Sequence, residues 1–507
     1  MEKNQSLINK VSPFAQITEG QKYIITKNLP QLIQIVLKDA AEFQSTQIQK
    51  LKALQQLKMI CCIGDIGEYL TQIFKLLAKI YTIDDKYYLN ECRQICYLIG
   101  LKIQIDYYLP TLINQSRFEL QAQQSKTLCN LINLISETIV HENDNLDLQS
   151  LVYLIGDIEN VYSDCWEVME CIYHLEDRII GQSQQELPIY VRQLFQVLLT
   201  IRSFNKKDCE CLLQQLSTKC GYTSVTDLHA NEISLILEQI ANQEQFKTWK
   251  YNTREFLKFK AIVIGCGDGI SKYMQQIIQI MKYSLGGDQE VELRLEVLLL
   301  LDKVVQIQSI KDTIKMYSAV MISQLLIQSM VWKANKPTVK VRKAAVIITL
   351  YLSEMLSQEE ILELFPSLTA PLKSCMTDDW APDLRFASSK LATSLIQKCQ
   401  ILNYEIIRDF YPSLLERLDD SQNQIRIEIT FAIGALMQQK YDSSTILEYI
   451  VKATLIHLDD SSEEVQRAIF ECLLKCPEKR VVLKEAEQAI KNFKYPRLCQ
   501  ELIKLVS

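Results

Sequence analysis

Apolar and polar residues follow one another along most of this chain with the spacing of amphipathic helices. The runs ISKYMQQIIQIMKYS (270–284) and VELRLEVLLLLDKVVQI (291–307), for example, repeat apolar residues three and four positions apart. Short polar links, rather than alternating strand-like segments, separate such runs. The pattern predicts an all-α protein made of many helices joined by short turns.

One arrangement returns three times in the C-terminal part: a helical run, two aspartates, a short polar link and a second helix. The copies are LKSCMTDDWAPDLRFASSKLATSLI (372–396), LERLDDSQNQIRIEITFAIGALMQQ (415–439) and TLIHLDDSSEEVQRAIFECLLK (454–475). Counted from the second aspartate, an aliphatic residue lies five positions on and a long polar residue six positions on. The pairs are Asp379 with Arg385, Asp420 with Arg426, and Asp460 with Gln466.

Two looser copies precede these three. Asp288 is followed by Arg294 at the same spacing, whereas Lys336 stands where Arg342 would have its aspartate. A unit of about 40 residues holds two helices that cannot bury their apolar faces alone, so successive units are expected to stack into a solenoid. Roughly a dozen such units fit in the chain. A proline also recurs in the first helix, at Pro30, Pro110, Pro188, Pro366 and Pro412.

The aspartates fall where a carboxylate can accept hydrogen bonds from the first N–H groups of the second helix. The arginines Arg294, Arg342, Arg385 and Arg426 lie in the first turns of that helix. Two interpretations follow: an internal ladder in which each arginine reaches an aspartate of a neighbouring unit, or a basic ladder offered to an acidic partner. The internal ladder is preferred.

The repeat is hard to follow between 202 and 260. We therefore expect N-terminal helical repeats over 1–201, an irregular helical connection over 202–260, and C-terminal repeats over 261–507. One continuous solenoid is the expected arrangement, with a soft boundary in the connection.

Composition adds to this picture. Only 13 glycines and 11 prolines occur in 507 residues, which agrees with helices joined by short polar turns. The net charge of −6 argues against nucleic acid as a partner. The first residues lack the apolar core of a signal peptide, and no run of 18 uncharged apolar residues occurs, so no membrane is expected as a partner. The 16 cysteines are expected to be reduced and mostly packed in the core.

The stretch AIVIGCGDG (261–269) resembles the strand and glycine-rich turn of a nucleotide- or methyl-donor-binding enzyme. The segments after it read as helices, however, and a cofactor loop needs further alternating strands. We therefore interpret Gly265, Gly267 and Gly269 as a tight or flexible turn between two stacked helical units. No cofactor is expected.

No set of residues has the spacing of a catalytic or metal site. The densest group is Cys209, Cys211, Cys220 and His229, which lacks the paired C-x₂-C spacing of structural zinc. Cys171 and His174 lie one helical turn apart, without a residue that would orient the histidine. We expect no enzyme, and no catalytic, cofactor-binding or metal-binding residues.

Two tryptophans fall at or beside turns, Trp332 next to Lys333, and Trp380. An exposed tryptophan at such a place can anchor a partner protein. The alternative is that each indole covers the core between units, and this reading is preferred.

The repeat resembles the HEAT repeat, which implies a right-handed α-solenoid of HEAT/armadillo-like helical hairpins. The C-terminus goes further: the turn His457-Leu-Asp-Asp460 and the final Pro496, Cys499, Leu502 and Leu505 resemble the HEAT-repeat axonemal dynein assembly factors. This resemblance covers about 360–507, and before that it is one of architecture only.

The resemblance implies a non-enzymatic scaffold that assists the cytoplasmic preassembly of dynein arms in ciliated cells. Dynein arm subunits and chaperones or co-chaperones would be its partners. Two alternatives stay open: a structural adaptor resident in the axoneme of the cilium, and a tubulin-binding HEAT protein.

Overall fold

The computed structural model describes the chain as a succession of α-helices and short turns, and no strand occurs among the residues that it describes. The predicted all-α solenoid of HEAT/armadillo-like helical hairpins is confirmed. The described residues are 23, 26–41, 47–81, 85–140, 146–182, 186–204, 208–242, 245–331, 338–399, 401–441 and 444–507.

The chain divides into two compact units, Met1–Glu232 and Ile233–Ser507, and the division lies inside the segment 202–260. This segment is itself largely helical. It contains α12 (Asp208–Lys219), α13 (Val225–Asn242) and the start of α14 (Arg254–Gly265).

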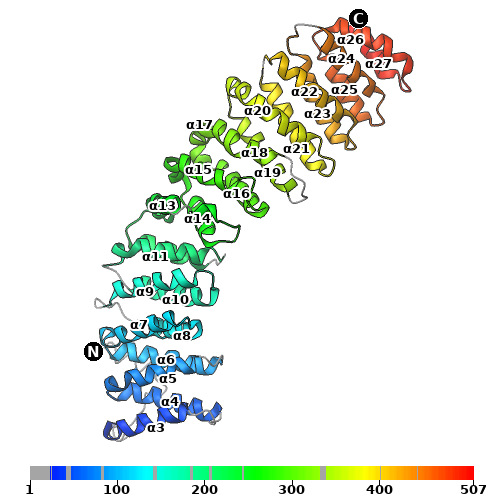
Figure 1. The fold of residues 1–507 in the computed structure, drawn as a ribbon. Coiled ribbons are helices and arrows are strands. Elements are labelled where there is room, and N and C mark those ends of the chain that lie inside the picture. Colours follow the sequence, from blue (N-terminus) through cyan, green and yellow to red (C-terminus); the bar gives the residue numbers. More distant parts are fainter. Residues whose placement is uncertain are drawn as a thin grey trace. The chain divides into compact units, whose positions relative to one another are not determined.

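The first unit stacks antiparallel helical hairpins one on another (Figure 1). The second helices of the hairpins, α4, α6, α8, α10 and α12, pack side by side in this order, and so do the first helices. The hairpins are α3 (Leu29–Ala41) with α4 (Gln47–Ile63), α5 (Leu70–Ile80) with α6 (Lys86–Lys102), α7 (Ile105–Gln121) with α8 (Ser125–Thr138), α9 (Leu148–Tyr162) with α10 (Trp166–Gln182), and α11 (Leu187–Arg202) with α12.

The second unit repeats the same plan, with the second helices α14, α16, α19, α21, α23, α25 and α27 in sequence. The first helix before α19 is built from α17 (Lys311–Met321), a π-helical turn and α18 (Ile327–Met330). The other helices are α15 (Met274–Ser284), α16 (Val291–Val305), α19 (Thr338–Ser353), α20 (Gln358–Met376), α21 (Pro382–Lys398), α22 (Tyr404–Glu416), α23 (Asn423–Met437), α24 (Ser444–Leu455), α25 (Glu463–Leu474), α26 (Lys479–Ala489) and α27 (Arg497–Val506).

The core of each unit runs between the stacked helices, because each helix turns its apolar residues toward its neighbours. In α21, Leu384 and Leu391 are fully buried. Pro110, Pro366 and Pro412 lie inside first helices, whereas Pro188 lies in the first turn of α11, where no N–H is needed. The recurring proline is therefore tolerated in two different ways.

The glycine stretch 261–269 lies in helical structure. α14 runs through Ala261 to Gly265, and a 3₁₀ helix from Gly267 to Tyr273 leads into α15. Gly267 has φ of +52°, in the left-handed region that favours glycine. A phosphate-binding turn would follow a strand. The predicted helix-to-helix turn is confirmed, and its form is tight.

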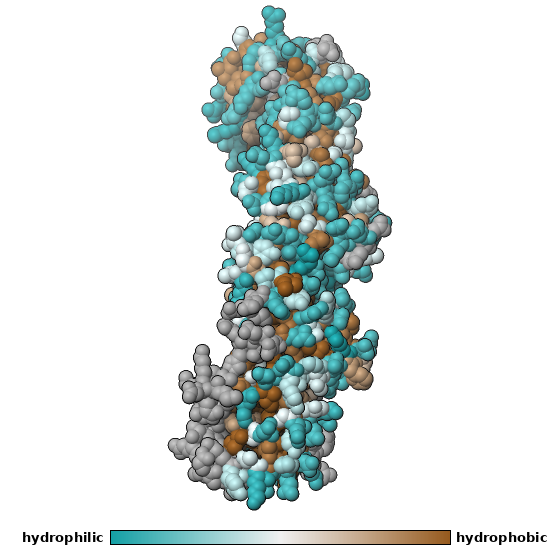
Figure 2. Space-filling view, turned by 90° about the vertical axis from the view of Figure 1, so that its left-hand side faces the viewer, coloured by the Kyte–Doolittle hydropathy of each residue, from teal (hydrophilic) through white to brown (hydrophobic). Residues whose placement is uncertain are grey.

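The surface has both apolar and polar residues. On the side shown in Figure 2, apolar residues lie in small groups among polar ones. Among the described helices, none combines the length and the apolar character needed to cross a bilayer.

Candidate interaction surface

Three arginines on successive second helices each reach an aspartate in the turn of the following hairpin. Arg342 Nη1 lies 2.5 Å from Asp378 Oδ2, and Arg385 Nε lies 2.7 Å from Asp420 Oδ2. Arg426 Nη1 lies 3.0 Å from Asp460 Oδ2. The pairs join α19, α21 and α23 to the turns before α21, α23 and α25. The internal arrangement is therefore the one that the structure shows.

Burial makes these pairs more than surface salt bridges. The side chains of Arg342 and Asp378 are only 1% and 3% exposed, and Asp420 has no exposed side-chain surface. Arg342 Nε also donates to the Met330 carbonyl (3.0 Å), and Arg385 Nη1 donates to the Asp378 carbonyl (2.8 Å). In Arg342 and Arg385 every guanidinium nitrogen has a hydrogen-bond partner, so the cost of burying these two charges is offset by specific hydrogen bonds, whereas Arg426 Nε has none among the described residues.

Each of these aspartates also caps its own turn. Asp378, Asp420 and Asp460 accept hydrogen bonds from the backbone N–H two residues on, at 3.1, 3.0 and 2.8 Å. One carboxylate thus fixes the turn of its hairpin and receives the arginine of the preceding hairpin. This double use explains why aspartate and arginine recur together in the sequence.

The spacing misassigned one member of the series. The residue that pairs and caps before α21 is Asp378, and Asp379 is exposed. In the next two hairpins a 3₁₀ turn, such as Arg417–Asp419, extends the first helix before the capping aspartate. α20 ends at Met376 without such a turn, so the capping position falls one residue earlier.

Arg294 and Asp288 stand apart from this ladder. Arg294 is buried, its Nε has no hydrogen-bond partner among the described residues, and burial lowers the pKa of its guanidinium. Asp288 is exposed in the turn before α16. Lys336, which aligns with the aspartates, lies outside the described residues.

Of the two tryptophans at predicted turns, the structure describes only Trp380. Trp380 is 82% exposed in the turn between α20 and α21, so its indole does not cover the core. Its neighbours Asp379 and Asp383 are exposed as well. Trp332 and Lys333 lie outside the described residues.

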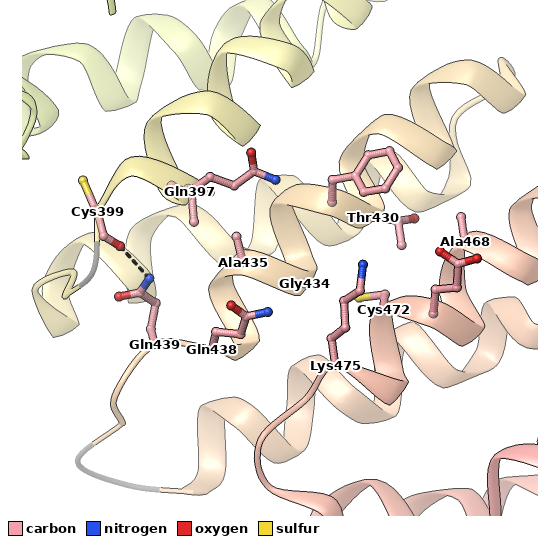
Figure 3. A pocket seen from close by; sticks show the side chains of 13 residues that line it. Gln397, Cys399, Thr430, Gly434, Ala435, Gln438, Gln439, Ala468, Cys472 and Lys475 are labelled. Atoms are coloured by element: carbon pink, nitrogen blue, oxygen red, sulfur yellow. Dashed lines mark hydrogen bonds between the residues drawn. The ribbon is translucent and has the colours of Figure 1, made fainter. Parts of the chain in front are cut away.

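A hollow of about 400 Å³ opens across three successive second helices, α21, α23 and α25. Small residues line part of it, namely Gly434 and Ala435 on α23 and Ala468 on α25. Gly434 allows the close approach of α25, since a Cβ there would lie 3.3 Å from Cys472 Sγ. Figure 3 shows Gln397, Gln438 and Lys475 around this opening, one from each helix or its end.

The polar groups of the hollow differ in what they can still bind. Gln439 is buried and uses both ends of its amide: Nε2 donates to the Cys399 carbonyl (2.9 Å) and Oε1 accepts from the Leu402 N–H (2.8 Å). Gln397 and Gln438 are exposed. An exposed carboxamide both donates and accepts, so it can bind a peptide group or a polar side chain.

Two buried cysteines also line the hollow. Burial raises the pKa of the Cys472 thiol to about 12 and that of Cys399 to about 11, so both thiols stay protonated near neutral pH.

The hollow belongs to a longer exposed row on the second helices. Leu299, Ile347 and Phe431 are 42–45% exposed. Each lies six residues after the buried aliphatic residue of the repeat pattern, which is Leu293 in α16, Val341 in α19 and Ile425 in α23. Lys390 and Glu471 occupy the same place on α21 and α25 and are also exposed. Our reading of the sequence missed this row, although the repeat spacing itself contained it.

The cysteine and histidine groups singled out in the sequence are held by other contacts. Cys209 Sγ donates to the Leu198 carbonyl (3.3 Å), and His229 lies between the Val225 carbonyl and the Arg202 guanidinium. Within the described part of the chain, no three histidine, cysteine or acidic side chains are placed to hold a metal ion.

The fold and its repeat turns define a HEAT/armadillo-like helical solenoid. By sequence, the chain is similar to dynein axonemal assembly factor 5 along nearly its whole length: the Xenopus laevis protein is 22% identical over 96% of this chain, and the human protein 25% identical over 65%. A family described as dynein axonemal assembly factor 5, HEAT-repeat domain, matches residues 14–205. The similarity therefore includes the N-terminal half, where the sequence alone indicated only a shared architecture.

The chain spans 59% of the Xenopus laevis protein and 40% of the human one. Among solved structures, a Kap121p mutant aligns with 92% of this chain and 48% of its own, at 10% identity and a TM-score of 0.42. Importin beta aligns with 100% of this chain and 66% of its own, at 11% identity and a TM-score of 0.38.

Proposed function

We propose that this chain is a non-enzymatic scaffold that binds protein clients during the assembly of axonemal dynein arms. The observation that carries the dynein assignment is the similarity over 96% of the chain to relatives named for that process. The clients would be dynein arm subunits, held together with chaperones or co-chaperones in the cytoplasm of ciliated cells.

The binding surface that we assign to this function is the exposed row on the second helices, centred on the hollow. Phe431 and the small residues beside it supply an apolar seat, and Gln397 and Gln438 supply hydrogen-bonding groups on either side. A central apolar anchor with a polar rim is the usual composition of a protein-binding site. The Arg–Asp ladder supports this role by fixing α19, α21, α23 and α25 relative to one another.

Affinity purification of the tagged chain from cells that assemble motile cilia, followed by mass spectrometry, tests the proposal. Dynein arm chains together with chaperones are expected in the cytosolic fraction. Their absence, with the chain itself well recovered, would overturn the assignment. Recovery mainly from demembranated axonemes would instead support a resident adaptor.

A tubulin-binding role is a second candidate because Trp380 is exposed at a turn. Its exposed acidic neighbours Asp379 and Asp383 favour a neutral or basic partner at this place, so the local charge weighs against an acidic partner such as tubulin. Co-sedimentation with microtubules, compared between the unmodified chain and Trp380→Ala, distinguishes the two. Binding that depends on Trp380 would favour tubulin.

A further inference from the structure

Two cysteines of the first unit meet between the second helices of adjacent hairpins. Cys129 on α8 and Cys171 on α10 both donate their thiols to the carbonyl oxygen of Glu167, at 3.7 and 3.3 Å. The two thiols are also within hydrogen-bonding reach of each other, so the one proton of Cys171 can go either to this carbonyl or to the sulfur of Cys129. The two sulfur atoms, 42 residues apart in sequence, therefore share one small site.

The two thiols have different access to solvent. Cys129 is half-buried, whereas Cys171 is 8% exposed. The hydrogen bond from Cys171 lowers the pKa of Cys129, and the same hydrogen bond together with burial raises the pKa of Cys171. Cys129 is thus the thiol that ionises first and that a small reagent reaches. Cys171 is the protonated neighbour behind it.

A third thiol lies nearby but has a different partner. Cys165 Sγ donates to the Glu167 carboxylate (Oε2, 3.3 Å), and burial raises its pKa. An acidic neighbour disfavours the thiolate, so Cys165 is the weaker nucleophile.

We propose that Cys129 and Cys171 form a thiol–disulfide exchange site that accepts a small-molecule disulfide and closes into a disulfide joining α8 to α10. In the first step the Cys129 thiolate attacks one sulfur of the small disulfide and expels the other as a thiolate. In the second step Cys171 loses its proton to solvent and attacks Cys129 Sγ, which expels the remaining small thiolate. The protein dithiol loses two electrons, and the small disulfide gains them and becomes two thiols.

The Cys129–Cys171 disulfide would link α8 to α10, two neighbouring second helices of the first unit. α8 and α10 already pack side by side, so the bond would join two helices that are neighbours in the reduced chain. The closed loop of 42 residues restricts the unfolded chain, and the oxidised protein is therefore expected to unfold at a temperature several degrees higher.

The test exposes the native full-length chain to oxidised glutathione, alkylates the remaining thiols and compares peptides before and after reduction. Cleavage after glutamate is needed, because no lysine or arginine lies between 127 and 177. We expect a linked pair of peptides holding Cys129 and Cys171. In Cys171→Ser, Cys129 should instead accumulate as a glutathione mixed disulfide, at least tenfold above the unmodified chain.

Two controls make the result specific. Cys165→Ser retains the pair and should form the Cys129–Cys171 link as the unmodified chain does. The exposed Cys211 should form only a mixed disulfide and reports that the reagent is active. A link to Cys165, or no link while Cys211 reacts, would overturn the proposal. Equal rates of linking in native and denatured chains would overturn it as well.

Discussion

The guanidinium of Arg385 in one hairpin binds the carboxylate of Asp420 in the next hairpin through two hydrogen bonds. Nε donates to Oδ2 at 2.7 Å and Nη2 donates to Oδ1 at 3.0 Å. Both groups are nearly removed from water. A buried salt bridge with two hydrogen bonds fixes the position of one repeat on the next more closely than apolar packing alone.

Removing this carboxylate should be costly. Asp420→Ala leaves Arg385 buried without its partner and removes the cap on the Gln422 N–H. We expect a loss of about 3–5 kcal/mol in the free energy of unfolding of the second unit, measured by denaturant unfolding. The neighbouring Asp419→Ala, whose side chain is 82% exposed, should change it by less than about 0.5 kcal/mol. Similar losses in the two variants would contradict the ladder.

Acid should weaken the first unit through His229. Burial and the nearby Arg202 lower the pKa of this imidazole to about 4, against the opposing hydrogen bond to the Val225 carbonyl. The folded chain therefore binds fewer protons than the unfolded chain between pH 6.5 and 4. The stabilisation is complete above pH 6.5 and is lost as the pH falls through this window.

The size of this effect is about 3 kcal/mol if the shift is fully expressed. Thermal unfolding between pH 7.5 and 4 measures it. His229→Phe, which retains an aromatic ring against Phe195, should flatten the dependence, whereas the exposed His174→Gln should not. An unchanged slope in His229→Phe would contradict the assignment.

A matched pair of glycines tests the packing of α6 on the end of α8. A Cβ at Gly100 would lie 2.2 Å from the Thr138 carbonyl oxygen, so Gly100→Ala forces these helices apart. We expect a loss of about 1–3 kcal/mol. Gly156 in α9 has open space at the same position, and Gly156→Ala should stabilise by up to about 1 kcal/mol through helix propensity. Thermal unfolding measures both variants. If Gly100→Ala and Gly156→Ala both raised or both lowered the unfolding temperature, this account would be contradicted.

Glu176 should be a source of instability. It is fully buried, neither carboxylate oxygen has a hydrogen-bond partner among the described residues, and burial together with Glu159 raises its pKa far above the usual value. Its neutral form is favoured in the folded chain, so it costs stability once the pH exceeds the unfolded pKa of about 4.5. Glu176→Leu should raise the free energy of unfolding at pH 7 by about 1–3 kcal/mol, measured by denaturant unfolding. A lower free energy of unfolding in Glu176→Leu would contradict this prediction, because it would mean that the carboxyl group stabilises the fold.

The sequence was sufficient for the repeat and for most of the ladder, because an aspartate, an aliphatic residue and a long polar residue keep one spacing in the three C-terminal copies, with arginine in two of them and Gln466 in the third. It could not show that Asp378 replaces Asp379, because this depends on where α20 ends and on the absence of a 3₁₀ turn there. A difference of one residue at a helix end leaves no mark in the apolar pattern.

The exposed row and the thiol pair were missed for another reason. Both bring together residues about one repeat apart, such as Gln397 with Gln438 and Cys129 with Cys171. Superimposing the second helices of successive repeats, rather than searching for local motifs, would have placed them side by side. The hollow is lined in part by the small residues Gly434 and Ala468, which look like ordinary helix residues in the sequence.

The most direct test of the scaffold account is the recovery of dynein arm chains from ciliated cells on three forms of this protein. These are the unmodified chain, Phe431→Ser in the hollow, and Ile456→Ser, which is 60% exposed beyond the end of α24. The account predicts recovery on the unmodified chain and on Ile456→Ser, and at least a tenfold loss on Phe431→Ser. Recovery that is equal on all three forms, or absent from all three, would contradict it.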